Sequence, residues 1–340
     1  MGDAGAGVAG DGSPRAGMRG AAPLADAFIV EGPDATGCST ALFYSCNTIV
    51  TVRALAPRSA LAGGARVVRD AFRRYESLFS RTLPGSDVSR LNAAGGRAVP
   101  IAPETADLLR ASLGYCAASR GRFDVTIGSA SRLWDFHRGI APEPAALAEA
   151  ARHVGWRAVR LERRDGKPGG GPTWRARLAD PKAMVDLGGT AKGWMADRAC
   201  EILAAHGIAD FAVSLGGNVA ARGTGPAGDG WQVAVRDPWG ARPAERLAIR
   251  DASAVTSGTY ERAFARDGRL YHHVLEPTTG MPVETDAVSA TLVCARSADA
   301  EGFSTTVLAL GMEAGAAFAR ERPEIEAVLL IGADGRVARV

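Results

Sequence analysis

The segment from Thr256 to Pro282 gathers more side chains capable of chemistry than any other part of the sequence. It holds Thr256, Ser257, Tyr260 and the pair His272–His273, which are two of only five histidines among 340 residues. A histidine beside a turn rich in hydroxyls and glycine suits proton transfer near neutral pH. The structural alternative is a strand over residues 269–275 followed by a Pro-Thr-Thr-Gly turn, with one histidine in the core and one in water. These residues alone leave both interpretations open.

Two glycine pairs each follow a predicted strand. The first, in Val185–Trp194 (VDLGGTAKGW), stands between Asp186 and a helix that carries Lys192, one of only three lysines. Free N–H groups at a helix start, glycines and a lysine suit an anionic phosphate, whereas the alternative is a capped turn with a surface lysine. The second pair, in Leu215–Asn218, indicates backbone packed against a flat or phosphorylated ligand.

Glu301 and Thr305 are four residues apart on a predicted helix and therefore share one face. A carboxylate and a hydroxyl directed at one point can hold a hard cation such as Mg²⁺, with ligand phosphates as further oxygen donors. The alternative is a polar patch on a helix whose other face packs in the core.

Polar residues earlier in the sequence and one glycine-rich motif are further candidates for ligand binding. Ser86 and Asn92, and further on Asp124 and Trp134, offer hydrogen bonds and a large aromatic ring that suit a planar ligand, although each type is more often structural. The segment 223–228 fits GxGxxG, but Pro226 removes an N–H and a predicted strand follows, so we exclude a dinucleotide fingerprint.

The elements that must position these residues alternate irregularly. Helices are predicted over 58–81, 103–119, 143–153, 190–206, 298–310 and 314–321. Strands are predicted over 43–54, 157–161, 174–178, 183–186, 211–215, 231–236, 246–250, 269–275, 288–294, 328–331 and 337–340. This pattern favours an α+β fold of mixed sheets with flanking helices. Residues 39–340 are expected to form one catalytic domain of two interleaved subdomains, preceded by a disordered Gly/Ala-rich leader over residues 1–38.

Composition excludes several classes of protein. The apolar fraction of 46% and charged fraction of 23% are those of a soluble globular protein, and a net charge of +3 gives no electrostatic footprint for nucleic acid. The five cysteines form no CxxC pair, which argues against a zinc site or a disulfide framework and favours reduced thiols. Because no signal-peptide or lipoprotein leader and no run of about 18 apolar residues is seen, we expect a cytoplasmic protein without membrane insertion.

Six motifs in fixed order carry a resemblance to a known family. They are Phe79–Ser80 through Ser86 to Asn92, Gly121–Asp124 with Trp134, Asp186–Gly193, Leu215–Asn218, Thr256–Gly258 with Tyr260, and His273 with Pro277–Gly280. Over roughly residues 43–335 the chain resembles the ApbE family of FAD:protein FMN transferases. The resemblance implies an ApbE-like (T-fold-like) fold and a Mg²⁺-dependent enzyme. Such an enzyme cleaves the pyrophosphate of FAD, joins FMN to a threonine or serine hydroxyl of a target flavoprotein, and releases AMP.

The resemblance also assigns roles to residues. It implies that His273 is the base that takes the proton of the attacking hydroxyl. Metal oxygens are expected from Gly189, Glu301 and Thr305. Contacts to FAD are expected from Asn47, Thr48, Ser86, Asn92, Asp124, Trp134, Asp186, Lys192, Gly193, Thr256, Ser257, Gly258 and Tyr260.

Five positions depart from the family pattern. They are Asn47 in place of glycine, Thr82 in place of an aromatic residue, Thr259 in place of an acidic residue, and Glu276 and Glu301 in place of aspartate. The departures keep three alternatives open: a protein that binds and delivers FAD without transfer, a Mg²⁺-dependent FAD pyrophosphatase with water as acceptor, and a module that docks a flavoprotein without handling flavin.

Overall fold

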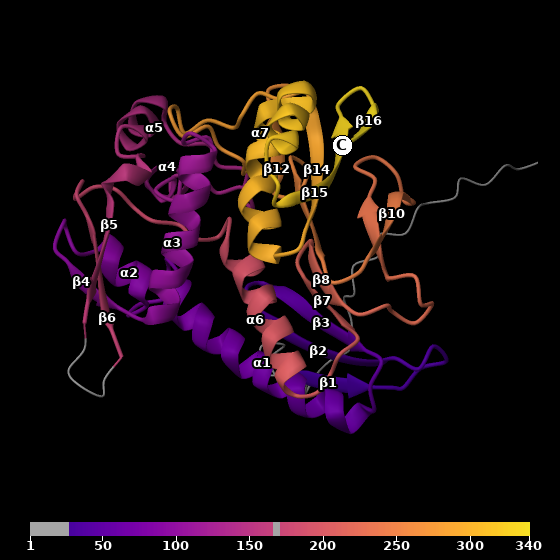
Figure 1. Ribbon diagram of the computed structural model, residues 1–340. Coiled ribbons are helices and arrows are strands. Elements are labelled where there is room, and N and C mark those ends of the chain that lie inside the picture. Colours follow the sequence, from indigo (N-terminus) through magenta and orange to yellow (C-terminus); the bar gives the residue numbers. More distant parts are fainter. Residues whose placement is uncertain (1–26, 166–170) are drawn as a thin grey trace, which may run out of the picture.

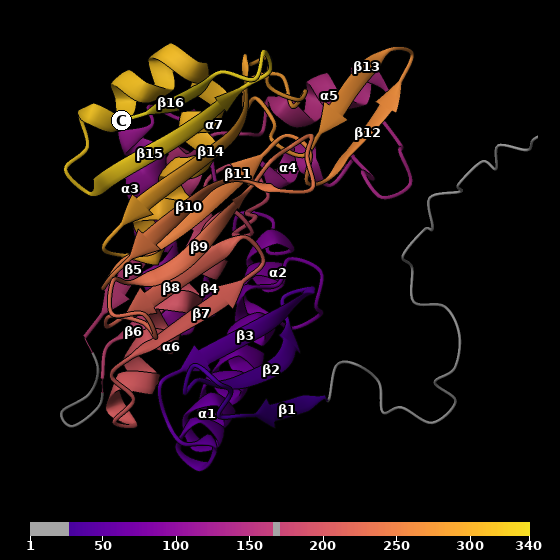
Figure 2. The same ribbon diagram turned by 90° about the vertical axis from the view of Figure 1, so that its right-hand side faces the viewer.

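A large antiparallel sheet forms the body of the molecule in the computed structural model, which describes residues 27–165 and 171–340. Among these residues the sheet has nine strands in the order β1-β2-β3-β7-β8-β11-β14-β15-β16. Its strands are β1 (Phe28–Glu31), β2 (Ser39–Ser45), β3 (Thr48–Ala54), β7 (Phe211–Leu215), β8 (Asn218–Arg222), β11 (Ser253–Gly258), β14 (Ala287–Cys294), β15 (Ile325–Gly332) and β16 (Val337–Arg339). Figure 2 shows them stacked from β1 to β16.

Three long helices cover one face of this sheet (Figures 1 and 2). They are α1 (Arg58–Phe79), α6 (Ala191–Ala205) and α7 (Ser297–Arg320), which pack on β2, on β7 and β8, and on β11, β14 and β15. The hairpin of β9 (Trp231–Arg236) and β10 (Pro243–Ile249) lies on the opposite face, where Trp231 and Ile249 pack against Ala221 and Ala254. The middle of the sheet is therefore covered on both faces, whereas its outer strands keep exposed apolar side chains such as Ile29 and Ile49.

A second, smaller part lies between α1 and α6 in the sequence. It contains the helices α2 (Asp87–Asn92), α3 (Pro103–Ala118), α4 (Gly128–Ser131) and α5 (Pro144–Ala151) and the strands β4 (Val99–Ile101), β5 (Val159–Arg164) and β6 (Thr173–Leu178). The hairpin of β12 (Ala263–Arg266) and β13 (Arg269–His272) comes from the C-terminal half but packs here, through Phe264 and Tyr271, against Trp134. The predicted α+β fold is confirmed.

Two predicted strands are wrong. Residues 43–54 belong to two strands, β2 and β3, because Cys46 and Asn47 turn the chain with φ of 51° and 58°. Two consecutive residues with positive φ make the two-residue turn that joins antiparallel strands, and apolar alternation continues across it unchanged. Residues 183–186 form no strand, since Met184 makes only an isolated bridge with Ile127.

Two further boundaries differ from the sequence expectation. The segment 298–310 and the segment 314–321 join into α7, whose course is bent at Gly311 with φ of 83°. The expected leader over 1–38 extends too far, because β1 pairs with β2 and the Arg69 guanidinium lies 4.9 Å from the Phe28 ring centroid. Residues 1–26 of the expected disordered leader lie outside the described part of the chain.

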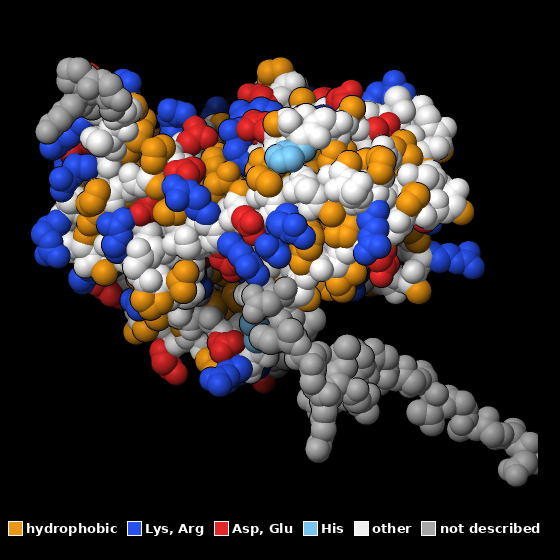
Figure 3. Space-filling view, turned by 90° about the horizontal axis from the view of Figure 1, so that it is seen from below, with side chains coloured by type: hydrophobic (Ala, Val, Ile, Leu, Met, Phe, Trp, Pro, Cys, Tyr) orange, Lys and Arg blue, Asp and Glu red, His pale blue; other side chains and the backbone are white. Residues whose placement is uncertain are grey.

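Surface and thiol chemistry agree with the composition. On the face seen in Figure 3, Lys and Arg side chains are interspersed with Asp and Glu. All five cysteines are free, and four of them are buried. Within residues 27–165 and 171–340, none of the helices has both the length and the apolar character needed to cross a membrane.

Candidate active site

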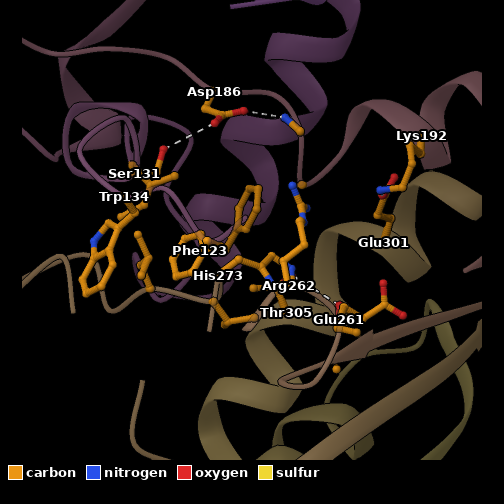
Figure 4. Close-up of a pocket in the computed structure, with 18 of the residues that line it drawn as sticks. Phe123, Ser131, Trp134, Asp186, Lys192, Glu261, Arg262, His273, Glu301 and Thr305 are labelled. Carbon is orange, nitrogen blue, oxygen red and sulfur yellow. Dashed lines mark hydrogen bonds and ion pairs between the residues drawn. The ribbon is translucent and has the colours of Figure 1, made fainter. Parts of the chain in front are cut away.

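A cleft of about 410 Å³ opens where the two parts of the molecule meet. One wall consists of β11 and the first turns of α6 and α7, and the other consists of the segments 122–137 and 261–277 (Figure 4). Eleven of the residues expected at the site line it: Asp124, Trp134, Asp186, Gly189, Lys192, Thr256, Ser257, Gly258, His273, Glu301 and Thr305. Segments far apart in the sequence thus converge on one cavity.

Glu301 is the buried carboxylate of the first wall. Its Oε1 lies 2.5 Å from Lys192 Nζ, and its Oε2 accepts the backbone N–H of Gly193. The carboxylate side chain is 7% exposed and the lysine side chain 27% exposed, so this ion pair stands at the edge of the cleft with its acidic end inside (Figure 4). Both oxygens of Glu301 are therefore engaged.

The close contact of α6 with α7 produces this geometry. A Cβ at Gly193 would lie 2.5 Å from the Ser297 carbonyl oxygen, so only glycine permits the approach. Asp197 of α6 accepts the N–H groups of Ser297 and Ala298 at 2.8 and 3.0 Å, which caps the start of α7. Glycine and cap together fix where Glu301 stands, one turn into α7.

Hydroxyls surround the same point. Thr305 follows Glu301 by one helical turn, and Ser257 Oγ on β11 lies 3.5 Å from Thr305 Oγ1 and 2.8 Å from Ser304 Oγ. One carboxylate with neighbouring hydroxyls suits a Mg²⁺ ion that draws its other oxygens from phosphate and water. The described residues contain no cluster of three His, Cys, Asp or Glu that could hold a metal ion without such help. Asp299 contributes nothing here because it accepts the Tyr115 hydroxyl at 2.7 Å.

His273 lies on the second wall, in the segment 261–277. Burial, together with the positive charges of Arg262 and Lys192 and with His272, lowers the pKa of His273 to about 3. Its Nδ1 is buried without a hydrogen-bond partner in the part of the chain that the structure describes. The imidazole is therefore neutral at physiological pH and has a lone pair free to accept a proton. His272 is buried, and burial lowers its pKa, whereas His273 is only partly buried and lines the cleft. One histidine thus lies in the core, as expected, and the other faces the cleft and not the open surface.

Three arginines that the sequence analysis did not single out also line the cleft. Arg81 Nε pairs with Asp186 at 3.1 Å, and an Arg122 guanidinium nitrogen lies 3.3 Å from Glu276 Oε2. Arg262 also lines the cleft, and among the described residues its guanidinium forms no ion pair. Since arginine is the usual cation of this sequence, no local signal separates these three from the others.

An aromatic group closes the second wall. Trp134 stacks on Phe136 at 5.3 Å between ring centroids, and its Nε1 donates to the Gly280 carbonyl at 3.0 Å. Gly280 belongs to the predicted Pro-Thr-Thr-Gly turn, where it has φ of 69°, and a Cβ there would lie 2.7 Å from Leu147. The turn beside His273 thus serves to hold the tryptophan.

Six residues expected to contact the ligand do not line the cleft: Asn47, Thr48, Ser86, Asn92, Gly193 and Tyr260. Ser86 caps α2 by accepting the Ser89 N–H at 2.9 Å. The Asn92 amide bonds the N–H and carbonyl of Val185 at 2.7 and 2.9 Å, which positions the residue before Asp186. These two polar groups are consumed by local structure.

The local structure also explains why Asn47, Thr48 and Tyr260 do not line the cleft. Asn47 is exposed in its hairpin turn, and Thr48 packs at Gly216. The Tyr260 ring fills the space that a side chain at Gly258 would need, and the Arg236 guanidinium lies 5.1 Å from its centroid.

Asp124 lines the cleft but is bound within its own loop. Its carboxylate accepts from the N–H and hydroxyl of Thr126 and from the N–H of Trp156, and burial raises its pKa.

Comparisons with known proteins agree on one family. The sequence profile of the ApbE family matches residues 46–329. The chain is 36% identical to the FAD:protein FMN transferase of Treponema pallidum (strain Nichols), over 86% of this chain and 83% of the relative. It is 30% identical to that of Klebsiella pneumoniae (strain 342), over 76% and 79%. The apo flavinyl transferase ApbE of Pseudomonas stutzeri superposes with a TM-score of 0.74 at 26% identity, over 92% of this chain and 94% of that one.

Proposed function

This chain belongs to the ApbE family, and on that premise we propose that it transfers FMN from FAD to a threonine or serine hydroxyl of a target flavoprotein. AMP is the second product. The observation that carries the proposal is the meeting of a neutral, partly buried His273, whose Nδ1 has no partner among the described residues, with a cation-lined wall in one cleft. A transferase of this kind needs a proton acceptor next to a place where a diphosphate is held.

The pyrophosphate of FAD binds, in this proposal, at the start of α6. Arg81, Lys192 and Arg262 line the cleft, and the Gly188–Gly189 turn leads into a helix of 15 residues. Helix starts favour anions because their first N–H groups are unpaired and the helix dipole is positive there. The aromatic group around Trp134 then faces the planar isoalloxazine end.

His273 takes the proton of the acceptor hydroxyl. The hydroxyl oxygen bonds to the phosphorus of the FMN half, the phosphorus–oxygen bond to AMP breaks, and AMP leaves with that electron pair. Arg262 and Lys192 both lower the pKa of His273. A bound diphosphate offsets their charge, so the substrate itself raises the basicity of the imidazole.

Glu301, Thr305 and the Gly189 carbonyl would hold Mg²⁺, which when bound neutralises charge on the diphosphate. The protein's own part is to present these oxygens on two elements whose relative position is fixed by Gly193 and Asp197.

The test measures intact masses of both proteins after incubation with FAD, Mg²⁺ and an acceptor domain. We expect the acceptor to gain the mass of one FMN. His273→Ala should slow this by roughly 10²- to 10⁴-fold, the usual contribution of a general base. The matched control is His206→Ala, since within residues 27–165 and 171–340 that ring bonds only the Ile202 carbonyl, at the exposed end of α6; it should leave transfer unchanged.

Three results would contradict the proposal, and each identifies one of the alternatives. Bound, uncleaved FAD with an unmodified acceptor indicates a protein that delivers FAD. Release of FMN and AMP with an unmodified acceptor indicates an FAD pyrophosphatase. A titration that detects no binding of FAD would indicate a module that docks a flavoprotein without handling flavin.

A further inference from the structure

The positively charged side chains that line the cleft differ in their ion-pair partners. Arg81 and Arg122 pair with carboxylates at or near the surface, and Arg262 has no carboxylate partner among the described residues. Lys192 alone is paired with a deeply buried acid, Glu301, whose second oxygen is taken by the Gly193 N–H. A divalent cation at Glu301 would need the position that Lys192 Nζ occupies.

Removal of the cation that pairs with Glu301 is costly. A carboxylate that is 7% exposed and loses its counter-ion carries a large desolvation penalty. Lysine can provide and withdraw this charge because its ammonium stands on a flexible four-carbon chain, here 27% exposed and open to the cleft. The backbone N–H of Gly193 cannot move in the same way, because α6 and α7 touch at that point.

We propose that Lys192 is an internal counter-ion that occupies Glu301 in the free protein and is exchanged for a divalent cation when a diphosphate enters the cleft. The diphosphate gives the ammonium a new anionic partner, and Thr305 and Ser257 stay in place beside Glu301 for the incoming ion. Lys192 is a positioning residue in this scheme, since it decides when the carboxylate is available.

Exchange couples the two ligands. A divalent cation binds weakly while it must displace the lysine, and more tightly once the diphosphate has drawn the lysine away. Because such coupling is reciprocal, FAD must also bind more tightly when the cation is present. The inference rests on the proposed function for the identity of the diphosphate, but the competition at Glu301 can be measured without any nucleotide.

The experiment titrates Mn²⁺ into the full-length protein by calorimetry without nucleotide. Lys192→Met and Lys192→Gln remove the competing charge, so we expect both to bind Mn²⁺ at least tenfold more tightly than the unchanged protein. Adding Glu301→Gln to either variant should abolish the gain. The matched control is Lys182→Met, because Lys182 pairs with Glu149 on the surface at 3.1 Å; its Mn²⁺ affinity should not change.

Mn²⁺ binding by both Lys192 variants that is no tighter than in the unchanged protein would overturn the proposal. If these variants fail to fold, a second measurement on the unchanged protein tests the proposal. Its affinity for FAD, measured by flavin fluorescence, should rise at least tenfold when Mg²⁺ is added. Equal affinities with and without Mg²⁺ would also overturn it.

Failure of the exchange and failure of the transferase proposal give different results. If the unchanged protein transfers FMN but the Lys192 variants bind Mn²⁺ no more tightly than it does, only the exchange proposal is contradicted. If those variants bind Mn²⁺ more tightly but the unchanged protein transfers no FMN, only the proposed reaction is contradicted.

Discussion

The two walls of the cleft differ in how firmly their side chains are held. On the wall of β11, α6 and α7, Ser257 and Glu301 each have at least two hydrogen-bond partners, and behind them Asp197 caps α7 with two more bonds. On the opposite wall, the Arg122 side chain is 52% exposed and Arg262 has no ion pair within the described residues. The first wall is preorganised and suits charge stabilisation. On the second wall Asp124 and Trp134 are also held by hydrogen bonds, but its two arginines can adapt to the ligand or to the acceptor protein.

The firm wall should be the more sensitive to small changes in volume. Gly193→Ala places a methyl group 2.5 Å from the Ser297 carbonyl oxygen and 2.9 Å from Glu301 Cβ. We expect a loss of about 1–3 kcal/mol in the free energy of unfolding, typical of overpacking, because backbone must move. Urea unfolding followed by circular dichroism measures the loss, and Mn²⁺ calorimetry reports the displaced Glu301.

The control for this change lies on α1. A Cβ at Gly63 meets nothing within 4 Å, and the residue is exposed within the helix. Gly63→Ala should therefore stabilise the protein by about 0.5–1 kcal/mol through helix propensity alone. An unfolding free energy for Gly193→Ala equal to that of the unchanged protein would show that α6 and α7 are not tightly joined.

Arg262 tests the adaptable wall. Loss of one charged hydrogen bond to the diphosphate in Arg262→Met should lower kcat/KM for transfer by about tenfold. The charge of Arg262 lowers the pKa of His273, so its removal raises that pKa. Because the protonated imidazole cannot act as a base, the acid limb of the pH profile should move to higher pH.

Arg266→Met is the control for Arg262, since Arg266 is exposed on β12 and does not line the cleft. An acid limb that stays at the same pH in Arg262→Met would separate Arg262 from His273 and weaken the contrast between the walls.

Local periodicity made part of the site predictable. Glu301 and Thr305 share a face because four residues make about one helical turn, and this needs no knowledge of the fold. Ser86 carried a local signal that was misread: a serine three residues before Ser89, at the start of a short helix, is a typical cap.

Long-range pairing decided the rest. Lys192 and Glu301 are 109 positions apart, and Asn92 and Val185 are 93 apart, so no window of sequence reveals either contact. Strand β8 was missed because it is short and lies between Gly217 and Gly223, and β11 was missed because its small and polar residues show no clear alternation, yet β11 carries Ser257. The α+β class is predictable from the mixture of elements, but the partners of each polar group depend on the packing of the sheet.

The cap of α7 offers a milder test of the firm wall. Asp197→Asn keeps the shape of the side chain but replaces one of the two oxygens that accept the N–H groups of Ser297 and Ala298. We expect a loss of about 1 kcal/mol in the free energy of unfolding, as for other helix caps. Thermal unfolding measures it, and a loss equal to that of Gly193→Ala would mean that the cap rather than the close contact holds the helices together.

The smallest effect is expected at the exposed ion pair of the adaptable wall. Arg122 and Glu276 are 3.3 Å apart with side chains 52% and 25% exposed, so water screens their attraction. Arg122→Met should change the free energy of unfolding by less than about 1 kcal/mol. If it instead raises KM for FAD or for the acceptor while kcat stays constant, Arg122 acts in binding and not in holding the fold. A loss of stability as large as that of Gly193→Ala would contradict the distinction between the walls, because it would place a structural bond on the side that we describe as free to adapt.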